Sequence, residues 1–346
     1  MNRLLSTLGG IRKAASRIRS LLVRKAVILV YHRVANLAND PWSMAVSPQN
    51  FEEHLEVLAE MKRPFLMDRF IEAHINGTLP DHVIAITFDD GYADSLSTVK
   101  PLLEEYALPA TVFLPSGAIG QAREYWWDEL EQLLLQPGCL PEEITIEIGD
   151  EFCTWRFHDD HPAASDLQWK AQEAPKTPRQ AAFLSLWRRL QQLSPSARSE
   201  ILDKLWACVG RKPQVRPDYR TLSAQEVVDL TRDGLVAVGA HTVNHASLSS
   251  LPLHLQGEEI QKSKTQLEQI VGKSVNTFAY PYGKISDYSK DTVSLVKEAG
   301  FWGACANFSG SVSPSTDPFQ LPRVYVPNWN GEQFASALYH WLAFSL

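Results

Sequence analysis

Residues 83–91 read Val-Ile-Ala-Ile-Thr-Phe-Asp-Asp-Gly, and this stretch decides the fold of the chain. Six mainly apolar residues, typical of a buried strand, end in two adjacent carboxylates and a glycine. Neighbouring side chains on a strand point to opposite faces, so we expect Asp89 and Asp90 to diverge as the chain leaves the sheet. One carboxylate can then hold a metal ion while the other handles a proton, and Gly91 permits a sharp turn. The alternative is an Asp-Asp-Gly turn that only closes the strand.

A second strand end of the same kind lies far downstream. Residues 234–240 read Gly-Leu-Val-Ala-Val-Gly-Ala, and His-Thr-Val-Asn-His follows at 241–245. Two imidazoles and one carboxylate form a metal site that leaves coordination positions open for water and substrate. A histidine pair at this spacing also occurs on helix surfaces, so the prediction depends on its combination with the carboxylates of the first strand.

Together these two segments resemble the first two motifs of the polysaccharide deacetylases (carbohydrate esterase family 4, the NodB homology domain). Tyr-His-Arg-Val at 31–34, typical of a subgroup with this N-terminal strand, and Phe-Ala-Tyr-Pro-Tyr-Gly at 278–283 extend the resemblance. It covers about 26–120 and 221–346. The implied fold is α/β, a distorted and incomplete (β/α) barrel with its chemistry at the carboxyl ends of the strands.

The resemblance also implies roles for single residues. Asp90, His241 and His245 would hold one divalent metal ion, with Zn²⁺ as the first choice and Co²⁺, Ni²⁺ or Mn²⁺ as alternatives. Asp89 would be the general base, and the backbone N–H of Tyr92 would stabilise the oxyanion. The implied enzyme is a carbohydrate deacetylase, a hydrolase of carbon–nitrogen bonds other than peptide bonds.

Two departures from the family pattern concern the partner of the base. The third motif usually carries an arginine that orients the catalytic aspartate, and Ala279 occupies that position. Arg323, in the segment Leu-Pro-Arg-Val at 321–324, is the substitute candidate, with a structural ion pair as the alternative. The family's fourth motif, Asp-x-x-Asp-Trp, is absent from the sequence.

A general acid is needed for the departing amine, and two histidines are candidates. Residues 338–340 read Leu-Tyr-His, the letters of the fifth motif, but 332–343 have a helical pattern, so we regard this match as chance. His32 follows the first strand, and members with a permuted motif order carry their catalytic histidine in such a Tyr-His segment. His32 is therefore the candidate acid, with a structural strand-end histidine as the alternative.

The alternation of strands and helices over 26–346 is interrupted by an insertion at 121–220. Its pattern predicts a β-hairpin over 144–157 and helices at about 179–192 and 196–209, an α+β subdomain beside the active-site mouth. Aromatic residues at its root and in the third motif are candidate sugar contacts, although such residues more often anchor an insertion. These candidates are Trp127, Tyr280 and Tyr282.

Charge is distributed unevenly along the chain. Residues 1–25 hold seven Lys or Arg and no acidic residue. Since the whole chain has a net charge of −7, the remaining residues have a net charge of −14. An acidic body argues against nucleic acid as a partner. The basic leader has apolar residues near helical spacing and lacks a signal-peptide core, so it predicts either a helix on an anionic membrane surface or a solvated helix.

The four cysteines, Cys139, Cys153, Cys208 and Cys305, are scattered without a paired motif and are expected to be reduced packing residues. With the leader, they indicate a cytoplasmic protein, peripheral on the inner face of the cytoplasmic membrane if the leader binds it.

The sequence thus predicts metal-dependent removal of N-acetyl (or N-formyl) groups from an amino sugar in a glycan, a glycolipid precursor or a nucleotide-linked sugar. An amidase of the same fold acting on a non-sugar C–N bond remains open. So does a catalytically silent glycan- or membrane-binding module, although the retained Asp89 argues against it.

Overall fold

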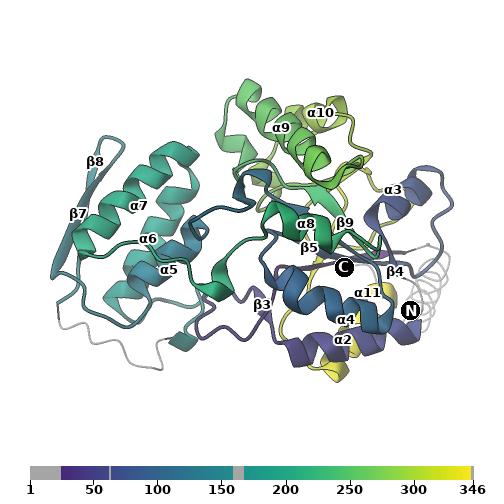
Figure 1. Cartoon of the computed structure of the whole chain (residues 1–346), viewed down its shortest axis with the longest axis horizontal. Helices are drawn as coiled ribbons and strands as arrows, with labels where there is room; N and C mark the ends of the chain where they lie inside the picture. Colours follow the sequence, from purple (N-terminus) through teal and green to yellow (C-terminus); the bar gives the residue numbers. More distant parts are fainter. Residues whose placement is uncertain (1–24, 62–63, 159–166, 344–346) are drawn as a thin grey trace, which may run out of the picture.

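A sheet of parallel strands forms the centre of the molecule (Figure 1). The computed structural model describes residues 25–61, 64–158 and 167–343. The order in the sheet is β11-β10-β9-β6-β5-β1-β12, with β4 beside β5, and every pairing in it is parallel. The strands are β1 (Val27–Tyr31), β2 (Arg33–Val34), β3 (Ala45–Val46), β4 (Pro64–Phe65), β5 (Ile84–Phe88), β6 (Ala110–Leu114), β7 (Glu143–Ile148), β8 (Glu151–Arg156), β9 (Val236–Ala240), β10 (Thr277–Ala279), β11 (Gly303–Cys305) and β12 (Val324–Tyr325).

Alternate residues of these strands enter two different cores, as expected for strands covered on both faces. On β5, Ile84, Ile86 and Phe88 pack outward with the helices, whereas Ala85 points inward. The inward layer is filled by one residue from each of several strands and by Leu321: Ile28, Ala85, Phe113, Ala279, Cys305 and Leu321. The sheet is therefore curled around a packed interior.

Few backbone pairings join the two ends of the curled sheet. A single parallel bridge joins Cys305, at the end of β11, to Leu321, shortly before β12. β12 then pairs with β1 through only two residues, Val324 and Tyr325. This is the distorted, incomplete (β/α) barrel predicted from the sequence, and the prediction is confirmed.

Helices cover the outside of the barrel on opposite sides, with α9 and α10 above the sheet and α2, α4 and α11 below it in Figure 1. α8 begins with a capping box, in which Ser223 and Glu226 satisfy each other's backbone N–H groups. The helices are α2 (Pro48–Met61), α3 (Met67–Ile75), α4 (Lys100–Tyr106), α5 (Trp126–Leu134), α6 (Pro178–Gln191), α7 (Pro195–Val209), α8 (Ala224–Leu230), α9 (Leu253–Val271), α10 (Lys290–Glu298) and α11 (Gly331–Ala343), with short helical turns at Ser95–Val99, Ser116–Ala118, Pro217–Tyr219, Leu248–Ser250 and Ile285–Asp287.

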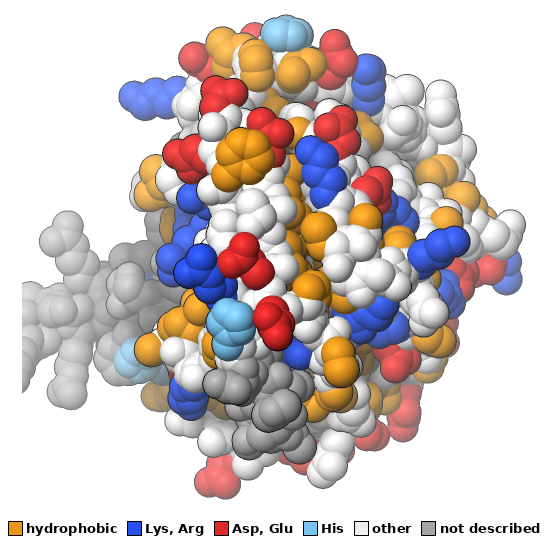
Figure 2. Space-filling view, turned by 90° about the vertical axis from the view of Figure 1, so that its left-hand side faces the viewer, with side chains coloured by type: hydrophobic (Ala, Val, Ile, Leu, Met, Phe, Trp, Pro, Cys, Tyr) orange, Lys and Arg blue, Asp and Glu red, His pale blue; other side chains and the backbone are white. Residues whose placement is uncertain are grey.

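The inserted segment forms a separate lobe beside the barrel, on the left of Figure 1. The expected hairpin is present as β7 and β8, paired in antiparallel register around Gly149-Asp150, and the two expected helices are α6 and α7. With α5 they enclose their own hydrophobic core, which includes Leu130, Phe183 and Leu205. On the outer end of this lobe, acidic and basic side chains are interspersed with apolar ones (Figure 2).

The predictions for the basic leader and for the four cysteines can be compared with the described residues. The basic leader lies outside the described residues except for Lys25, and no helix among the described residues is long and apolar enough to cross a membrane. Cys153 and Cys305 are buried packing residues, as expected. Cys139 and Cys208 are exposed, so the packing role predicted for them is wrong.

Candidate metal centre

The predicted site residues lie at the carboxyl ends of neighbouring barrel strands. Asp89 and Asp90 follow β5, His32 follows β1, and His241 follows β9. The register pairs Phe88 with Tyr31, and the Asp89 N–H donates to the Tyr31 carbonyl oxygen at 3.0 Å. The sheet therefore places these side chains around one pocket.

Asp90, His241 and His245 form a buried cluster whose ligand atoms all lie within 4.8 Å of one another. Asp90 Oδ1 is 3.2 Å from His245 Nε2 and 3.8 Å from His241 Nε2. His241 Nδ1 bonds to the Ala279 carbonyl oxygen at 2.7 Å, which makes it the protonated nitrogen and leaves Nε2 as a lone-pair donor. Asp90 Oδ1 is buried and has no hydrogen-bond partner among the residues that the structure describes. This donor set fits one divalent cation.

The backbone is strained at the same place. Four non-glycine residues here have positive φ: Asp90 at 70°, Thr242 at 64°, His245 at 50° and Tyr282 at 59°. Such conformations are uncommon for residues with a side chain and cluster at functional sites, where the surrounding fold imposes them. In this barrel they turn the ligand side chains toward one point.

Asp89 points into the barrel, away from the Asp90–His241–His245 cluster, and binds Arg323. The guanidinium donates to both carboxylate oxygens, at 2.7 and 2.6 Å, and its Nε donates to the Ala306 carbonyl oxygen at 2.9 Å. Both side chains are buried. Burial alone would raise the pKa of Asp89, but the charge of Arg323 outweighs it and holds this pKa below its usual range. Asp89 is therefore an ionised carboxylate in a fixed orientation.

Asp90 is also held ionised, by a different set of charges. Burial would raise its pKa, but the imidazole of His245, followed by those of His32 and His241, keeps it well below its usual range. The two adjacent aspartates thus diverge as the sequence predicts, one toward an arginine and one toward two histidines.

The other predicted residues are placed unequally. His32 lines the pocket with Asp89 and Asp90, and its buried Nδ1 has no hydrogen-bond partner in the described part of the chain. His340 is exposed on α11 and does not line this pocket. The Tyr92 side chain is buried, and its hydroxyl donates to Asp128 at 2.6 Å. The backbone N–H of Tyr92 donates no hydrogen bond to any of the described residues.

The pocket has a volume of about 350 Å³, within the usual range for small-molecule sites. Barrel loops and the inserted lobe both contribute to its lining. The lining residues are His32, Trp42, Met44, Asp89, Asp90, Trp127, Trp187, Gln191, Gln192, His241, His245, Tyr280, Tyr282, Lys284, Ser286, Asp287 and Asn307. All three predicted sugar-contact residues are among them.

Contacts of Tyr125 and Trp127 that support the candidate metal ligands were not predicted from the sequence. Tyr125 donates its hydroxyl to the Asp90 carbonyl oxygen at 2.5 Å and stacks on Trp127, with ring centroids 4.4 Å apart. Trp127 in turn packs edge-on against His245 at 4.9 Å. Trp127 therefore supports a metal ligand as well as lining the pocket. The Tyr-Trp-Trp run at the insertion root was its only sequence signal.

Glu259 on α9 supports the histidine loop from the other side. Its Oε2 accepts the backbone N–H groups of Val243 and Asn244 at 2.9 and 2.8 Å. No local pattern relates this glutamate to residues 241–245, so only the fold reveals it.

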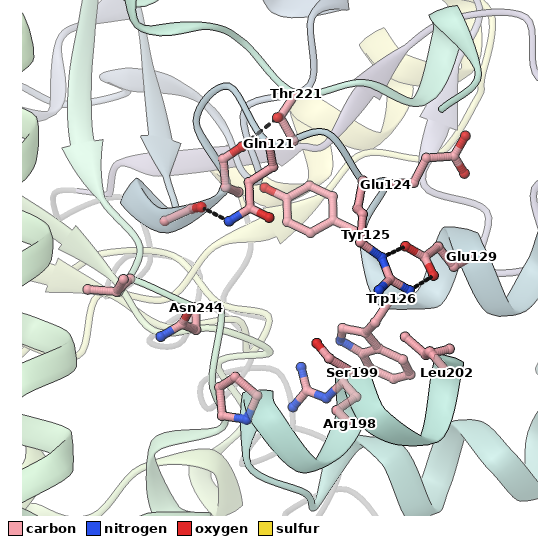
Figure 3. A pocket seen from close by; sticks show the side chains of 15 residues that line it. Gln121, Glu124, Tyr125, Trp126, Glu129, Arg198, Ser199, Leu202, Thr221 and Asn244 are labelled. Carbon is pink, nitrogen blue, oxygen red and sulfur yellow. Dashed lines mark hydrogen bonds and ion pairs between the residues drawn. The ribbon is translucent and has the colours of Figure 1, made fainter. Parts of the chain in front are cut away.

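A second, smaller cavity lies between the barrel and the inserted lobe (Figure 3). The carboxylates in its wall are already paired, Glu129 with Arg123 and Glu124 with Arg216. Arg198 donates to the carbonyl oxygens of Leu190 and Leu193 at the end of α6. These contacts account for the charged groups of the cavity without a ligand.

The candidate site lies in segments of the chain that match a known protein family. The polysaccharide deacetylase family matches residues 76–139 and 208–303, which include both aspartates and both histidines. The matched segments leave out 140–207, the greater part of the inserted lobe. The resemblance to the polysaccharide deacetylases is confirmed over these two segments of the chain.

Two relatives match part of this chain. YxkH of Bacillus subtilis, named for the same family, is 29% identical over 127 residues, 36% of this chain and 43% of that protein. The poly-β-1,6-N-acetyl-D-glucosamine N-deacetylase of Escherichia coli is 29% identical over 138 residues, 38% of this chain and 18% of that enzyme. The matched regions span less than half the length of either relative.

Solved structures show the same fold. The Streptococcus pyogenes deacetylase PplD, solved in complex with acetate, aligns with a TM-score of 0.56 at 16% identity, covering 91% of this chain and 99% of that one. A polysaccharide deacetylase from Bacillus cereus aligns with a TM-score of 0.54 at 17% identity, covering 91% of this chain and 69% of that one.

Proposed function

We propose that this protein is a metal-dependent hydrolase that removes the N-acetyl group from an amino sugar in a glycan or glycan precursor. One observation carries the proposal: an ionised Asp89, fixed by Arg323, shares a pocket with the Asp90–His241–His245 cluster. A base beside an open metal site is the arrangement that amide hydrolysis requires. The names of the relatives support a carbohydrate substrate.

Each residue has one task in this proposal. A bound divalent ion, Zn²⁺ by preference, would polarise the amide carbonyl and make the attacking water more acidic. Asp89 takes a proton from that water while the oxygen of the water bonds to the carbonyl carbon. The Tyr92 N–H donates to the resulting oxyanion. His32 gives a proton to the amine nitrogen as the C–N bond breaks, which leaves acetate and the free amine.

Asp89→Asn tests the proposal, because the amide side chain keeps the shape but cannot take the proton. Acetate release from a panel of N-acetylated sugars and lipid-linked glycans should fall by 10²-fold or more, on the order expected for a lost general base. Metal content per chain should be unchanged. An Asn variant as active as the natural chain contradicts the assignment.

The basic leader carries a second proposal, attachment to an anionic membrane surface at the cytoplasmic face. Seven cationic residues among 1–25 support it, since each such charge near an anionic surface contributes about 1 kcal/mol. Removal of residues 1–24 should abolish co-sedimentation with phosphatidylglycerol vesicles at low salt. Equal sedimentation of both forms contradicts the proposal.

A further inference from the structure

One wall of the site pocket comes from the inserted lobe. Trp187 on α6 lies 4.5 Å from Trp42, which precedes β3, at an interplanar angle of 42°. Trp187 also meets Tyr282, which follows β10, edge-on, with ring centroids 6.3 Å apart. We call Trp42, Trp187 and Tyr282 the aromatic wall; its ring contacts link one barrel loop, the lobe and another barrel loop.

The same helix extends this wall toward the mouth of the pocket. Gln191 is four residues after Trp187, so both side chains lie on one face of α6, and Gln192 adjoins it. Neither glutamine side chain has a hydrogen-bond partner among the described residues. Amides can both donate to and accept from sugar hydroxyls, whereas the tryptophans offer flat apolar faces to a sugar ring.

The rest of the pocket is bounded by the barrel itself. Met44, Asn307, Lys284 and Asp287 also line the pocket, together with the Asp90–His241–His245 cluster and Asp89. An internal residue of a polymer needs two exits, one for each neighbouring sugar. A pocket that the aromatic wall closes on the side of the lobe would leave a chain only one exit.

Most of the residues of this wall lie outside the family match. Trp187, Gln191 and Gln192 lie within 140–207, the segment that the match leaves out, and Trp42 precedes the matched residues, whereas Tyr282 lies inside the match. The proposed metal ligands and Asp89 also lie inside it. The part of the wall that the lobe supplies is thus distinct from the segments that carry the proposed chemistry.

We propose that the inserted lobe determines where on a glycan the enzyme acts. The pocket takes a single N-acetylated sugar or the terminal residue of a short glycan, and the aromatic wall excludes internal residues of a polymer. This inference rests on the proposed deacetylase function and adds its substrate class.

Product analysis of the natural chain is the first test and needs no variant. Metal-loaded protein is given N-acetylglucosamine oligomers from the monosaccharide to the pentasaccharide and the panel of N-acetylated glycans above. Mass spectrometry with fragmentation then locates the free amine. We expect one acetate per molecule at every length, always from a terminal residue. Removal from internal residues of the pentasaccharide overturns the inference while the deacetylase function stands.

Trp187→Ala is the second test, because it opens the wall without touching a metal ligand. Internal residues should become substrates, with kcat/KM for internal relative to terminal residues rising about tenfold or more. Trp187→Phe keeps an aromatic ring and should retain terminal selectivity. Phe152→Ala is the matched control, since Phe152 lies in the same lobe and is 75% exposed. Its product pattern should equal that of the natural chain.

The remaining outcomes are also decisive. A folded Trp187→Ala variant that still acts only on terminal residues contradicts a wall of this kind. No acetate from any substrate, despite one bound metal per chain, contradicts the proposed function and this inference with it.

Discussion

At the scale of single residues, the account depends on how the barrel separates two adjacent carboxylates. Asp89 continues the inward series of β5 that includes Ala85 and meets Arg323, while Asp90 adopts a positive φ and turns to the histidines. In the family pattern an arginine of the third motif contacts this aspartate, and Ala279 stands at that position here. Arg323, late in the chain, makes the contact instead. The exchange is possible because both segments reach the same end of the barrel.

Arg323→Met should be strongly destabilising, because it leaves Asp89 buried without its counter-charge. We expect the free energy of unfolding to fall by about 3–5 kcal/mol. Urea denaturation measures this loss. In the double variant Asp89→Asn/Arg323→Met no charge is left uncompensated, so part of the stability should return. If both variants lose the same amount, the ion pair is not the cause.

The choice between two histidines can also be made at this scale. His32→Ala should lower the turnover of an N-acetylated substrate by 10²–10⁴-fold, roughly the contribution of a general acid. His340→Ala should have near-normal turnover, because His340 is exposed on α11 outside the pocket. Steady-state acetate release from both variants decides the matter, and the reverse pattern would make His340 the acid.

At the scale of elements, the packing of α2 against α11 depends on a neutral histidine. His54 on α2 is fully buried, bonds to the Trp329 carbonyl oxygen at 2.8 Å and stacks on Phe334 of α11 at 4.2 Å. Burial lowers the pKa of His54 to about 4, against about 6.5 for a free imidazole. The contact therefore requires the uncharged ring.

This lowered pKa predicts a dependence of stability on pH. Between pH 6.5 and 4 the unfolded chain binds a proton at His54 and the folded chain does not, so His54 destabilises the fold as the pH falls through this window. The cost is on the order of 3 kcal/mol at pH 4. Denaturation of the natural chain and His54→Gln at both pH values isolates it, with exposed His254→Gln as the control. Parallel curves for the natural chain and His54→Gln would refute the prediction.

How far the sequence reaches differs between elements. The strands β1, β5 and β9 could be predicted because they are continuous apolar runs that end in polar motifs. The hairpin and helices of the insertion could be predicted from periodicity. Tyr125 and Glu259 could not be assigned, because their partners lie in segments that only the fold brings beside them. The same holds for the aromatic wall, whose three residues come from three separate segments.

At the scale of the whole molecule, two bodies share one pocket. The barrel supplies the candidate metal ligands and the proposed base and acid, while the inserted lobe supplies one wall and, through Trp127, a contact with His245. The account therefore assigns chemistry and selectivity to different parts of the chain. Substitutions on the pocket face of α6 should alter which substrates are accepted more than how fast the amide bond breaks.

The most direct test of the central claim is a metal titration of activity. Protein stripped with a chelator is reconstituted with increasing Zn²⁺, and acetate release from the best substrate of the panel is followed. Activity should rise linearly and reach a plateau at one equivalent per chain, and Asp90→Ala should show no rise at stoichiometric metal. Full activity in the stripped protein, or an Asp90→Ala variant that responds like the natural chain, would contradict the account.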